Sequence, residues 1–484
     1  MKNIMGNFSQ YGSPIFRQLS DDQLQEIHFA SLEILERTGV RLHLQEAVDI
    51  LKKAGARVFD DNRVCIPSHL VERALKTVPK RVVLCDREGN RVMPLEGNKS
   101  FFGPGSDCLN IIDHRTGERR NTRLADIVDA MKVCESLPNI DFVMSMFLPW
   151  DVPEPVLDRF QMEVMLSYTR KPIIFVTPGF EGCVDCVEMA EAVAGGPVEL
   201  RQNPFIGCYI NVSSDLIHNK DALQKLLYLA EKGIPTTYTS DSQRGATAPV
   251  TRAGALALTG AGHMVGLVLS QLMREGAPFI WGAWQQNLDL RTLIIPYADP
   301  DTKGLGAAQA HYYGLPYFGL AGCSDAKVLD AQAGAEAGMS LLIDALSGAN
   351  LIHDLGYLES GLTGSLQLLV ICDELVGWIR NFMQGTEVNA DTLALDVIDE
   401  VGPDGNFLGS DHTLKHYKKD WHSTLLDRQN YDNWAAAGNK SILETASEKV
   451  EEILNNVSAL VLPPEIQQKI RSIRQRAEAS ARAE

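Results

Sequence analysis

The sequence lacks the cysteine framework of a small secreted protein. Its nine cysteines are an odd number, scattered from Cys65 to Cys372 along 484 residues. Disulfide-stabilised domains carry closely spaced, even sets instead, so we expect reduced thiols. Cys183 and Cys186 form one CxxC pair, but the surrounding stretch is typical of a helix and no second ligand pair lies nearby. Because structural zinc requires four ligands, we expect no bound metal.

Positive charge is scarce as well. The chain has 45 Lys and Arg against 62 Asp and Glu, a formal charge of −17. This balance disfavours nucleic acid or an anionic membrane as the partner, and a neutral, cationic or zwitterionic ligand fits better. The first twenty residues contain no basic region followed by an apolar run, and no uninterrupted apolar stretch reaches the roughly 20 residues that span a bilayer. We therefore expect a soluble, cytoplasmic protein.

Apolar residues, by contrast, are abundant and periodic. They make up 45% of the chain, which indicates a large buried core. From Ser20 to Pro79 they recur at helical spacing, with Ser20 as a plausible N-cap and Gly39 as a plausible stop. We therefore expect a helical N-terminal extension over residues 1–98, which includes a short strand at RVVLCD.

Eight apolar or β-branched runs of strand length follow, each before a helical stretch. The runs are SFFGPG, DFVMSMF, KPIIFVTPG, FIGCYIN, PTTYTS, PFIWGAW, PYFGLAG and ANLIHDLGYL. Their spacing of roughly 35 residues suits one strand and one crossover helix, and continuously apolar runs suit parallel strands that are buried on both faces.

This pattern predicts a (β/α)8 TIM barrel over residues 99–400. A doubly wound open sheet is the alternative fold, but the glycine-rich nucleotide motifs of such sheets are missing from the sequence. Residues 401–484 are first polar, aromatic and irregular, then charged and amphipathic. We expect them to form a C-terminal loop and a helical tail that packs on the barrel.

Side chains just past the strand ends of a barrel face its working pocket, and here they are rich in aromatics. Such rings can surround a quaternary ammonium group, because each ring face carries negative potential. The candidates are Phe147, Trp150, Tyr238, Trp281, Trp284 and Tyr357. The alternative, about as probable for any one of them, is that they fill the upper layer of the barrel or cover loops.

Three charged or titratable residues complete the candidates. His353 ends the last apolar run, where it can act as a hydrogen-bond donor or as an acid or base at neutral pH, although a satisfied core histidine is an equal alternative. Lys327 is a candidate Schiff-base lysine, but it falls beyond its strand, near a helix start. Arg244 can contact a ligand.

Several segments, together covering most of the chain, resemble the trimethylamine:corrinoid methyltransferase (MttB) superfamily. They are LSDDQLQEIHFASLEILERTGVRL, the FGPGSD turn at 102–107, GATAPVT at 245–251, the long stretch from AGCSDAKVLD to HDLGYLESG at 321–361, and FLGSDHTLKHY at 407–417. The resemblance implies a (β/α)8 barrel that moves a methyl group from an amine nitrogen to the Co(I) of a separate corrinoid protein. It also implies that the enzyme forms a homo-oligomer and binds no cofactor tightly.

Founding members of that family carry pyrrolysine, whereas this chain has only standard residues. It therefore looks like a non-pyrrolysine member, similar to glycine betaine:corrinoid methyltransferase. The resemblance implies a quaternary amine substrate, with glycine betaine first and proline betaine or carnitine next. We expect His353, Gln285 and Arg244 to hold its carboxylate, and Gly103 and Gly105 of the FGPGSD turn to contact the corrinoid cofactor. The alternatives are a Schiff-base lyase or aldolase that uses Lys327, and a non-catalytic betaine-binding protein.

Overall fold

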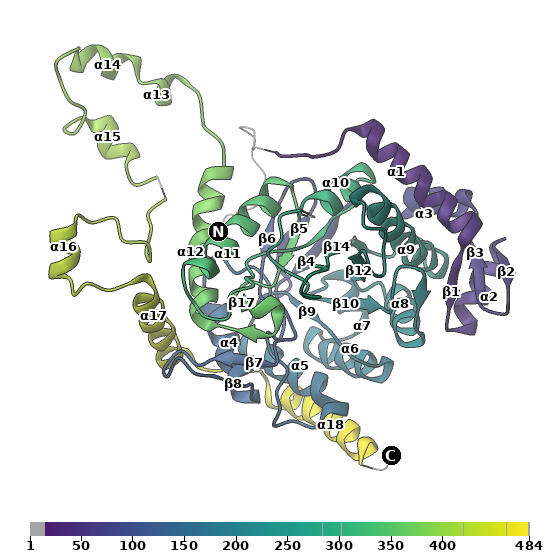
Figure 1. The fold of residues 1–484 in the computed structure, drawn as a ribbon. Coiled ribbons are helices and arrows are strands. Elements are labelled where there is room, and N and C mark those ends of the chain that lie inside the picture. Colours follow the sequence, from purple (N-terminus) through teal and green to yellow (C-terminus); the bar gives the residue numbers. More distant parts are fainter. Residues whose placement is uncertain (1–14, 283, 302, 420, 461, 483–484) are drawn as a thin grey trace.

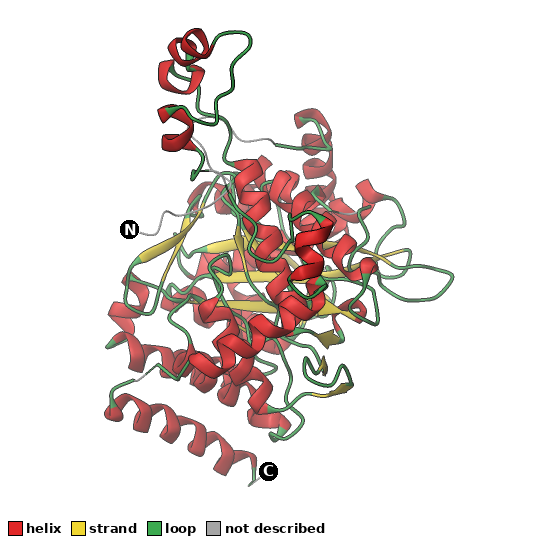
Figure 2. Cartoon of the chain, turned by 90° about the vertical axis from the view of Figure 1, so that its left-hand side faces the viewer, coloured by secondary structure: helices red, strands yellow, loops and turns green. Residues whose placement is uncertain are grey.

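The computed structural model describes residues 15–482 apart from 283, 302, 420 and 461. Its body consists of short strands at the centre with helices around them (Figures 1 and 2). The N-terminal elements lie at one side of this body. An arm that carries α13 to α16 extends from the opposite side (Figure 1).

Parallel strands form the centre of the body. They are β6 (Phe101–Phe102), β9 (Ile173–Phe175), β10 (Ile206–Val212), β12 (Thr236–Arg244), β13 (Phe279–Trp281), β14 (Trp284–Asn287), β15 (Phe318–Leu320) and β16 (Leu351–His353). One run of pairing is β9–β10–β12–β13, with β14 also paired to β12, and a second is β15–β16–β6; every pair in both runs is parallel. The prediction of parallel strands is confirmed.

Single bridges connect the two runs. Trp281 bridges to Tyr317, and Val143 bridges to Ile173, both in parallel register. The N–H of Asp141 donates to the carbonyl of Phe102 at 2.7 Å. The second expected strand, DFVMSMF, therefore makes bridges but no continuous strand, and Met146 within it has a positive φ of 63° that interrupts extended backbone.

Helices follow the strands and cover them. They are α4 (Leu124–Ser136), α5 (Leu157–Tyr168), α6 (Phe180–Ala194), α7 (Pro197–Gln202), α8 (Lys220–Lys232), α9 (Arg252–Met273), α10 (Leu305–Tyr312), α11 (Ala331–Leu346) and α12 (Leu366–Met383). By length and composition α9 could cross a membrane, but 83% of its apolar window is buried inside the protein. It contacts α1, α3 and α8, so it is a core helix.

The N-terminal region is mixed rather than purely helical. Its helices are α1 (Asp21–Glu33), η1 (Ile34–Thr38), α2 (Gln45–Lys53) and α3 (Ser68–Thr77), and its strands are β1 (Val40–Leu42), β2 (Arg57–Phe59), β3 (Arg63–Cys65), β4 (Val82–Cys85) and β5 (Arg91–Leu95). The start of α1 is as predicted, since Ser20 forms a capping box with Gln23. Gly39 ends the helical stretch with a φ of 70°, which favours glycine. The sequence pattern did not predict the strands β1, β2 and β3, because three residues are too few to show an alternating pattern.

Short elements surround the carboxyl ends of the strands. They are β7 (Asn110–Ile112), β8 (Arg119–Asn121), η2 (Glu154–Val156), β11 (Ile217–His218), β17 (Tyr357–Leu358), η3 (Glu359–Gly361) and β18 (Thr363–Gly364). The pairing β17–β18–β7–β8 joins the loop after β16 to the loop after β6. The loops that follow β16 and β6, two paired strands that lie far apart in the sequence, are thus held together at one end of the body.

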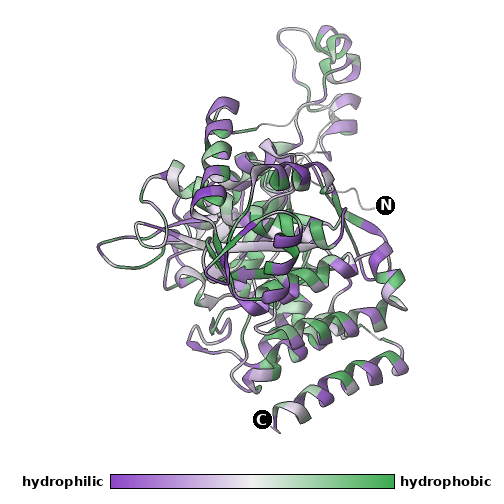
Figure 3. Ribbon diagram, turned by 90° about the vertical axis from the view of Figure 1, so that its right-hand side faces the viewer, coloured by the Kyte–Doolittle hydropathy of each residue, from purple (hydrophilic) through white to green (hydrophobic). Residues whose placement is uncertain are grey.

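The chain leaves the body at the end of α12, before residue 400. The arm then carries α13 (Ala390–Leu393), α14 (Leu395–Val401), α15 (Asp411–His416) and α16 (Tyr431–Ala436). Two long helices return to the body: α17 (Ile442–Asn456) contacts α12 and α4, and α18 (Pro464–Ala481) contacts α6. Hydrophobic residues, green in Figure 3, concentrate in the body and occur also on the arm.

Candidate active site

Four rings from four strands meet in one cluster, which we call the aromatic cluster: Tyr209 of β10, Trp284 of β14, Phe318 of β15 and His353 of β16. β10 and β14 both pair with β12, and β15 pairs with β16, all in parallel, so side chains near their carboxyl ends lie at the same end of the body. Tyr209 is half-buried and the other three are buried.

The rings are stacked rather than merely adjacent. The His353 ring lies 4.0 Å from Phe318 and 5.0 Å from Trp284, at interplanar angles of 16° and 22°. Tyr209 meets these rings at steeper angles, 5.3 Å from Phe318 and 6.0 Å from His353. The indole N–H of Trp284 donates to the carbonyl of Phe318 at 2.8 Å. This bond fixes the indole, so the ring faces are held in place before any ligand binds.

His353 is neutral in this setting. Burial lowers the pKa of its imidazole to about 3, with the Lys303 charge acting in the same direction. Nδ1 lies 2.6 Å from the carbonyl of Gly319, which can only accept, so Nδ1 carries the proton. Nε2 then presents its lone pair 3.5 Å from a carboxylate oxygen of Asp354. The lowered pKa favours the neutral imidazole near pH 7, and a catalytic role for His353 stays a prediction.

Acidic groups lie beside the aromatic cluster. Asp354 is buried and has a left-handed φ of 76°. The hydroxyl of Tyr357 lies 3.2 Å from a carboxylate oxygen of the exposed Asp107 and accepts from its backbone N–H at 2.9 Å. An aromatic wall with carboxylates at its edge is attractive to a cation and repulsive to an anion.

A cavity borders the cluster and is lined by residues that include Trp284, Tyr297, Lys303, Tyr317 and Asp344. Lys303 is buried and donates from Nζ to the carbonyl of Leu320. Burial raises the pKa of the Asp344 carboxyl to about 6, and the Lys303 charge opposes that rise. The cavity thus contains one buried cation next to the aromatic wall.

Asp325 ties three loops together over this end of the body. Its carboxylate accepts from the backbone N–H groups of Tyr297 and Ala298, and from the hydroxyl of Ser360 at 2.7 Å. Its own N–H donates to Glu336 at 2.8 Å. The loops that follow β14, β15 and β16 are therefore positioned by one carboxylate, which accounts for the GCSDA sequence at this point.

Two of the residues expected at the site lie in the aromatic cluster, Trp284 and His353. Trp281 and Tyr238 face the other side of the sheet. Trp281 packs on His263 of α9 at 5.3 Å, and the Tyr238 hydroxyl bonds His218 Nδ1 at 2.7 Å. Both face away from the cluster because successive side chains of a strand alternate between its two faces.

Other expected ligand contacts are engaged elsewhere. Trp150 is 61% exposed and its indole donates to the carbonyl of Leu109. Phe147 is fully buried and its ring lies against Gly364. Arg244 donates from Nε to the carbonyl of Val250 at 3.1 Å. These three residues are not brought to the cluster, whereas Tyr357 donates from its backbone N–H to the carbonyl of Asp354, the neighbour of His353, at 3.3 Å.

Gln285 lines the cavity, but its amide faces the first turn of α9. With the amide oriented to satisfy both neighbours, it accepts from the N–H of Leu256 at 2.8 Å and donates to the carbonyl of Arg252 at 3.3 Å. These two contacts occupy both ends of the amide. Gln285 therefore orders the start of α9 and retains one further N–H donor.

The two glycines of the FGPGSD turn are required by packing within the chain. A Cβ on Gly103 would lie 2.6 Å from the carbonyl oxygen of Phe142, and one on Gly105 would meet the Asp354 carboxylate and the Tyr357 hydroxyl. The space beside each glycine is filled by this chain's own atoms. The expectation that these glycines contact a corrinoid stays a prediction.

Lys327 does not have the environment that a Schiff-base lysine needs. Its side chain is exposed, and Nζ donates to the carbonyl of Asp325 at 2.7 Å. Cys183 and Cys186 are both free and buried in α6. Neither the cysteine pair nor Lys327 contributes a side chain to the aromatic cluster or to the cavity beside it.

Sequence reasoning missed Tyr209 and Phe318, which lie within strands rather than past their ends. A usable signal exists in β10, where Tyr209 precedes Asn211, at the carboxyl end of the FIGCYIN run, by two positions and so shares its face. Asn211 is exposed and accepts from Thr239 Oγ1 at 3.4 Å.

Comparison with known proteins agrees with this architecture. The family described as "Trimethylamine methyltransferase (MTTB)" matches residues 4–481. The chain is 34% identical to Trimethylamine methyltransferase MttB of Desulfitobacterium hafniense (strain DSM 10664 / DCB-2), covering 94% of this chain and 92% of that one. It is 30% identical to Glycine betaine methyltransferase of Desulfitobacterium hafniense (strain Y51), covering 95% and 96%.

The solved structure of the Methanosarcina barkeri monomethylamine methyltransferase (MtmB) is similar in fold alone. It superposes with a TM-score of 0.51 at 10% identity, covering 94% of this chain and 91% of that one. The match to the family extends over nearly the whole chain and includes the strands that carry the aromatic cluster. The chain therefore belongs to the trimethylamine methyltransferase (MttB) family and is a methyltransferase.

Proposed function

We propose that this protein transfers a methyl group from a quaternary ammonium substrate to the Co(I) of a cognate corrinoid protein. Glycine betaine is the first choice, and proline betaine or carnitine comes next. The observation that carries the proposal is the aromatic cluster with Asp354 at its edge, because stacked ring faces and a carboxylate select a permanent cation.

The proposal includes a closed (β/α)8 barrel, with the site at the carboxyl ends of its strands. The support comes from the contacts between the two runs of strands. Segment 141–143 bonds Phe102 on one side and bridges to β9 on the other, and Trp281 bridges to Tyr317. These contacts support the proposal that the parallel strands close into a barrel.

The substrate class follows from the chemistry available to standard residues. The sequence contains no pyrrolysine. A quaternary ammonium needs no electrophilic capture, because its positive charge already activates the methyl carbon. The electron pair of Co(I) forms the new Co–CH3 bond, the pair of the C–N bond stays on nitrogen, and a tertiary amine leaves without a proton transfer. A neutral His353 is compatible with this reaction, since no general acid is required.

The chain's contribution is binding and orientation. The ring faces of Trp284, Phe318 and Tyr209 would hold the ammonium head in a partly desolvated place and orient its methyl groups. The carboxylate of a betaine requires a donor. We propose Lys303 for this role ahead of Gln285 and Arg244, because it is a cationic donor with N–H groups beyond the one given to Leu320 and it lines the same cavity as Trp284.

Trimethylamine is the second candidate substrate. It is favoured by the 34% identity to a trimethylamine methyltransferase, against 30% to a glycine betaine methyltransferase. We also propose a cytoplasmic location, supported by nine free, buried cysteines. A homo-oligomer is proposed from an exposed apolar face between α11 and α12, which includes Leu375, Trp378 and Phe382.

Methyl transfer to the reduced corrinoid protein tests the proposal. Conversion of Co(I) to methyl-Co(III), followed by absorbance, is expected with one betaine and not with trimethylamine. Transfer from trimethylamine alone would favour the second candidate. No transfer from any of these amines to a partner of demonstrated activity would leave the binding-protein alternative.

A further inference from the structure

The arm between α12 and α17 has no core of its own. None of its four helices, α13 to α16, contains a buried residue. Large apolar side chains on it are exposed, such as Leu395 at 68% and Leu408 at 87%. Its anchors to the body include Ser423 and Thr424, which donate to Glu374, and the buried Leu425. A bound metal would add order to the helices further out.

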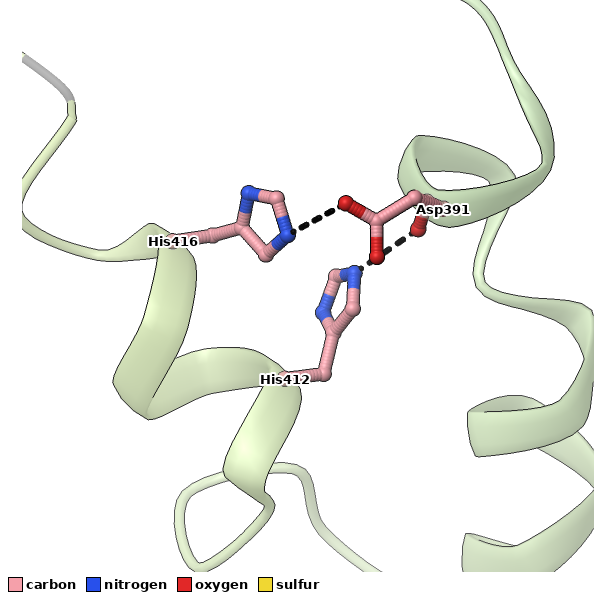
Figure 4. Close-up of side chains that lie close together, drawn as sticks. All are labelled: Asp391, His412 and His416. Carbon is pink, nitrogen blue, oxygen red and sulfur yellow. Dashed lines mark hydrogen bonds and ion pairs between the residues drawn. The ribbon is translucent and has the colours of Figure 1, made fainter.

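Two histidines on the arm share one helix face. His412 and His416 lie four residues apart on α15, and their ring centroids are 4.4 Å apart. Asp391 on α13 faces both rings (Figure 4). One ligand atom from each of the three residues lies within 4.8 Å of the others. Zinc bonds of about 2.0 to 2.2 Å would draw these atoms to within about 4.4 Å of one another, so binding requires only a small closing movement of the side chains.

One of these nitrogens makes an ion-pair contact but no hydrogen bond. Nε2 of His416 has no exposed surface and lies 3.2 Å from Oδ2 of Asp391. Nε2 of His412 lies 2.9 Å from the backbone carbonyl of Asp391. Buried polar atoms without a hydrogen bond are rare in folded proteins, and an ion at this point would give the nitrogen a ligand bond.

We propose that Asp391, His412 and His416 bind a divalent transition ion, Zn²⁺ by preference, which clasps α13 to α15. Two imidazoles and one carboxylate suit Zn²⁺ and disfavour Mg²⁺ and Ca²⁺, which take oxygen ligands. Water would complete the coordination. The sequence did not indicate this site because Asp391 and His412 are 412 − 391 = 21 residues apart, and the fold of the arm brings them together.

Lys415 competes for the same carboxylate. Its Nζ lies 2.8 Å from each oxygen of Asp391, so the ion must displace it. The competing interpretation is that Lys415 and the histidines form only a charged surface cluster around Asp391. The two interpretations differ in what removal of Lys415 does. If the cluster is a metal site, loss of Lys415 increases its affinity for the ion. If it is only a charged cluster, loss of Lys415 removes one ion pair and creates no metal binding.

The experiment uses the full chain, without an affinity tag and stripped with EDTA. Zn²⁺ is titrated by calorimetry, and Co²⁺ is titrated by its visible d–d absorption. We expect one ion per chain for the wild type. The His412→Ala/His416→Ala variant should bind at least about 100-fold more weakly, because it loses two of three ligands. The matched control, His43→Ala/His422→Ala, removes two exposed histidines outside the cluster and should bind like the wild type.

Two further readouts test the clasp. Lys415→Gln should bind Zn²⁺ up to about five-fold more tightly, since an exposed competing ion pair is lost. Zn²⁺ should slow proteolysis within residues 385–440 in the wild type and the control variant, but not in His412→Ala/His416→Ala. Failure of the wild type to bind Zn²⁺ would overturn the proposal, and so would equal binding by the wild type and His412→Ala/His416→Ala.

Discussion

Replacement of Trp284 gives the sharpest prediction about the aromatic cluster. Trp284→Leu keeps an apolar side chain but removes the ring face that stacks on His353 at 5.0 Å and on Phe318 at 5.5 Å. A desolvated cation over an indole gains about 2 kcal/mol. Since 1.4 kcal/mol is a factor of about ten, the dissociation constant for glycine betaine should rise about 30-fold. Trp284→Phe retains a ring face, so its dissociation constant for glycine betaine should rise only a few-fold.

The assay is equilibrium binding, with a ligand control that separates charge from packing. Tert-butylacetate has the shape and carboxylate of glycine betaine but no positive charge. Its affinity should change less than about three-fold in Trp284→Leu, because little more than packing is lost. Trp378→Leu, on the outer face of α12, should leave both affinities unchanged. Equal losses for the two ligands would refute the cation-binding role of the ring.

Three further predictions address stability, the lyase alternative and loop order. Burial lowers the pKa of His263 to about 4 and that of His353 to about 3, so the unfolded chain binds protons first as the pH falls below about 6.5. The free energy of unfolding should therefore be lower by about 2 kcal/mol per histidine at about pH 5. Chemical denaturation at several pH values should show a smaller decrease in this free energy for His263→Gln. The exposed control His43→Gln should show the same decrease as the wild type. Lys327→Ala should retain methyl transfer within about two-fold, and borohydride should trap no adduct, whereas a trapped adduct would restore the lyase. Asp325→Asn removes a charge that accepts from three groups, so it should lower the free energy of unfolding by about 1.5 to 3 kcal/mol. It should also raise KM, because the loops that it holds surround the site. An unchanged KM would show that the positions of these loops do not depend on Asp325.

The strands of the body were predictable because parallel strands buried on both faces are continuously apolar. FIGCYIN and ANLIHDLGYL contain β10 and β16 in the expected places. The direction of each side chain was harder to predict. Trp281 was expected past its strand end, but it lies in β13 and faces α9, whereas Trp284 faces the cluster. A shift of one residue at a strand end changes the face, and sequence patterns do not fix strand ends that closely.

The arm shows a different limit. Its polar, aromatic composition indicated irregular structure, but not that it leaves the body after α12. The apolar periodicity of a helix arises from its buried face, and α13, α14 and α15 have no buried residue, so their sequences show no such pattern. Contacts such as those of Asp391 with α15 depend on how the arm folds, so they become visible only in the structure.

The most direct test of the proposed function is a single turnover with glycine betaine that carries deuterated N-methyl groups. The enzyme, the Co(I) corrinoid protein and the labelled substrate are mixed, and the products are identified by mass spectrometry. We predict one deuterated methyl on cobalt for each dimethylglycine formed, with no label on the enzyme. Label bound to the enzyme, or dimethylglycine formed without methylated cobalt, would contradict direct transfer from a quaternary ammonium held in the aromatic cluster.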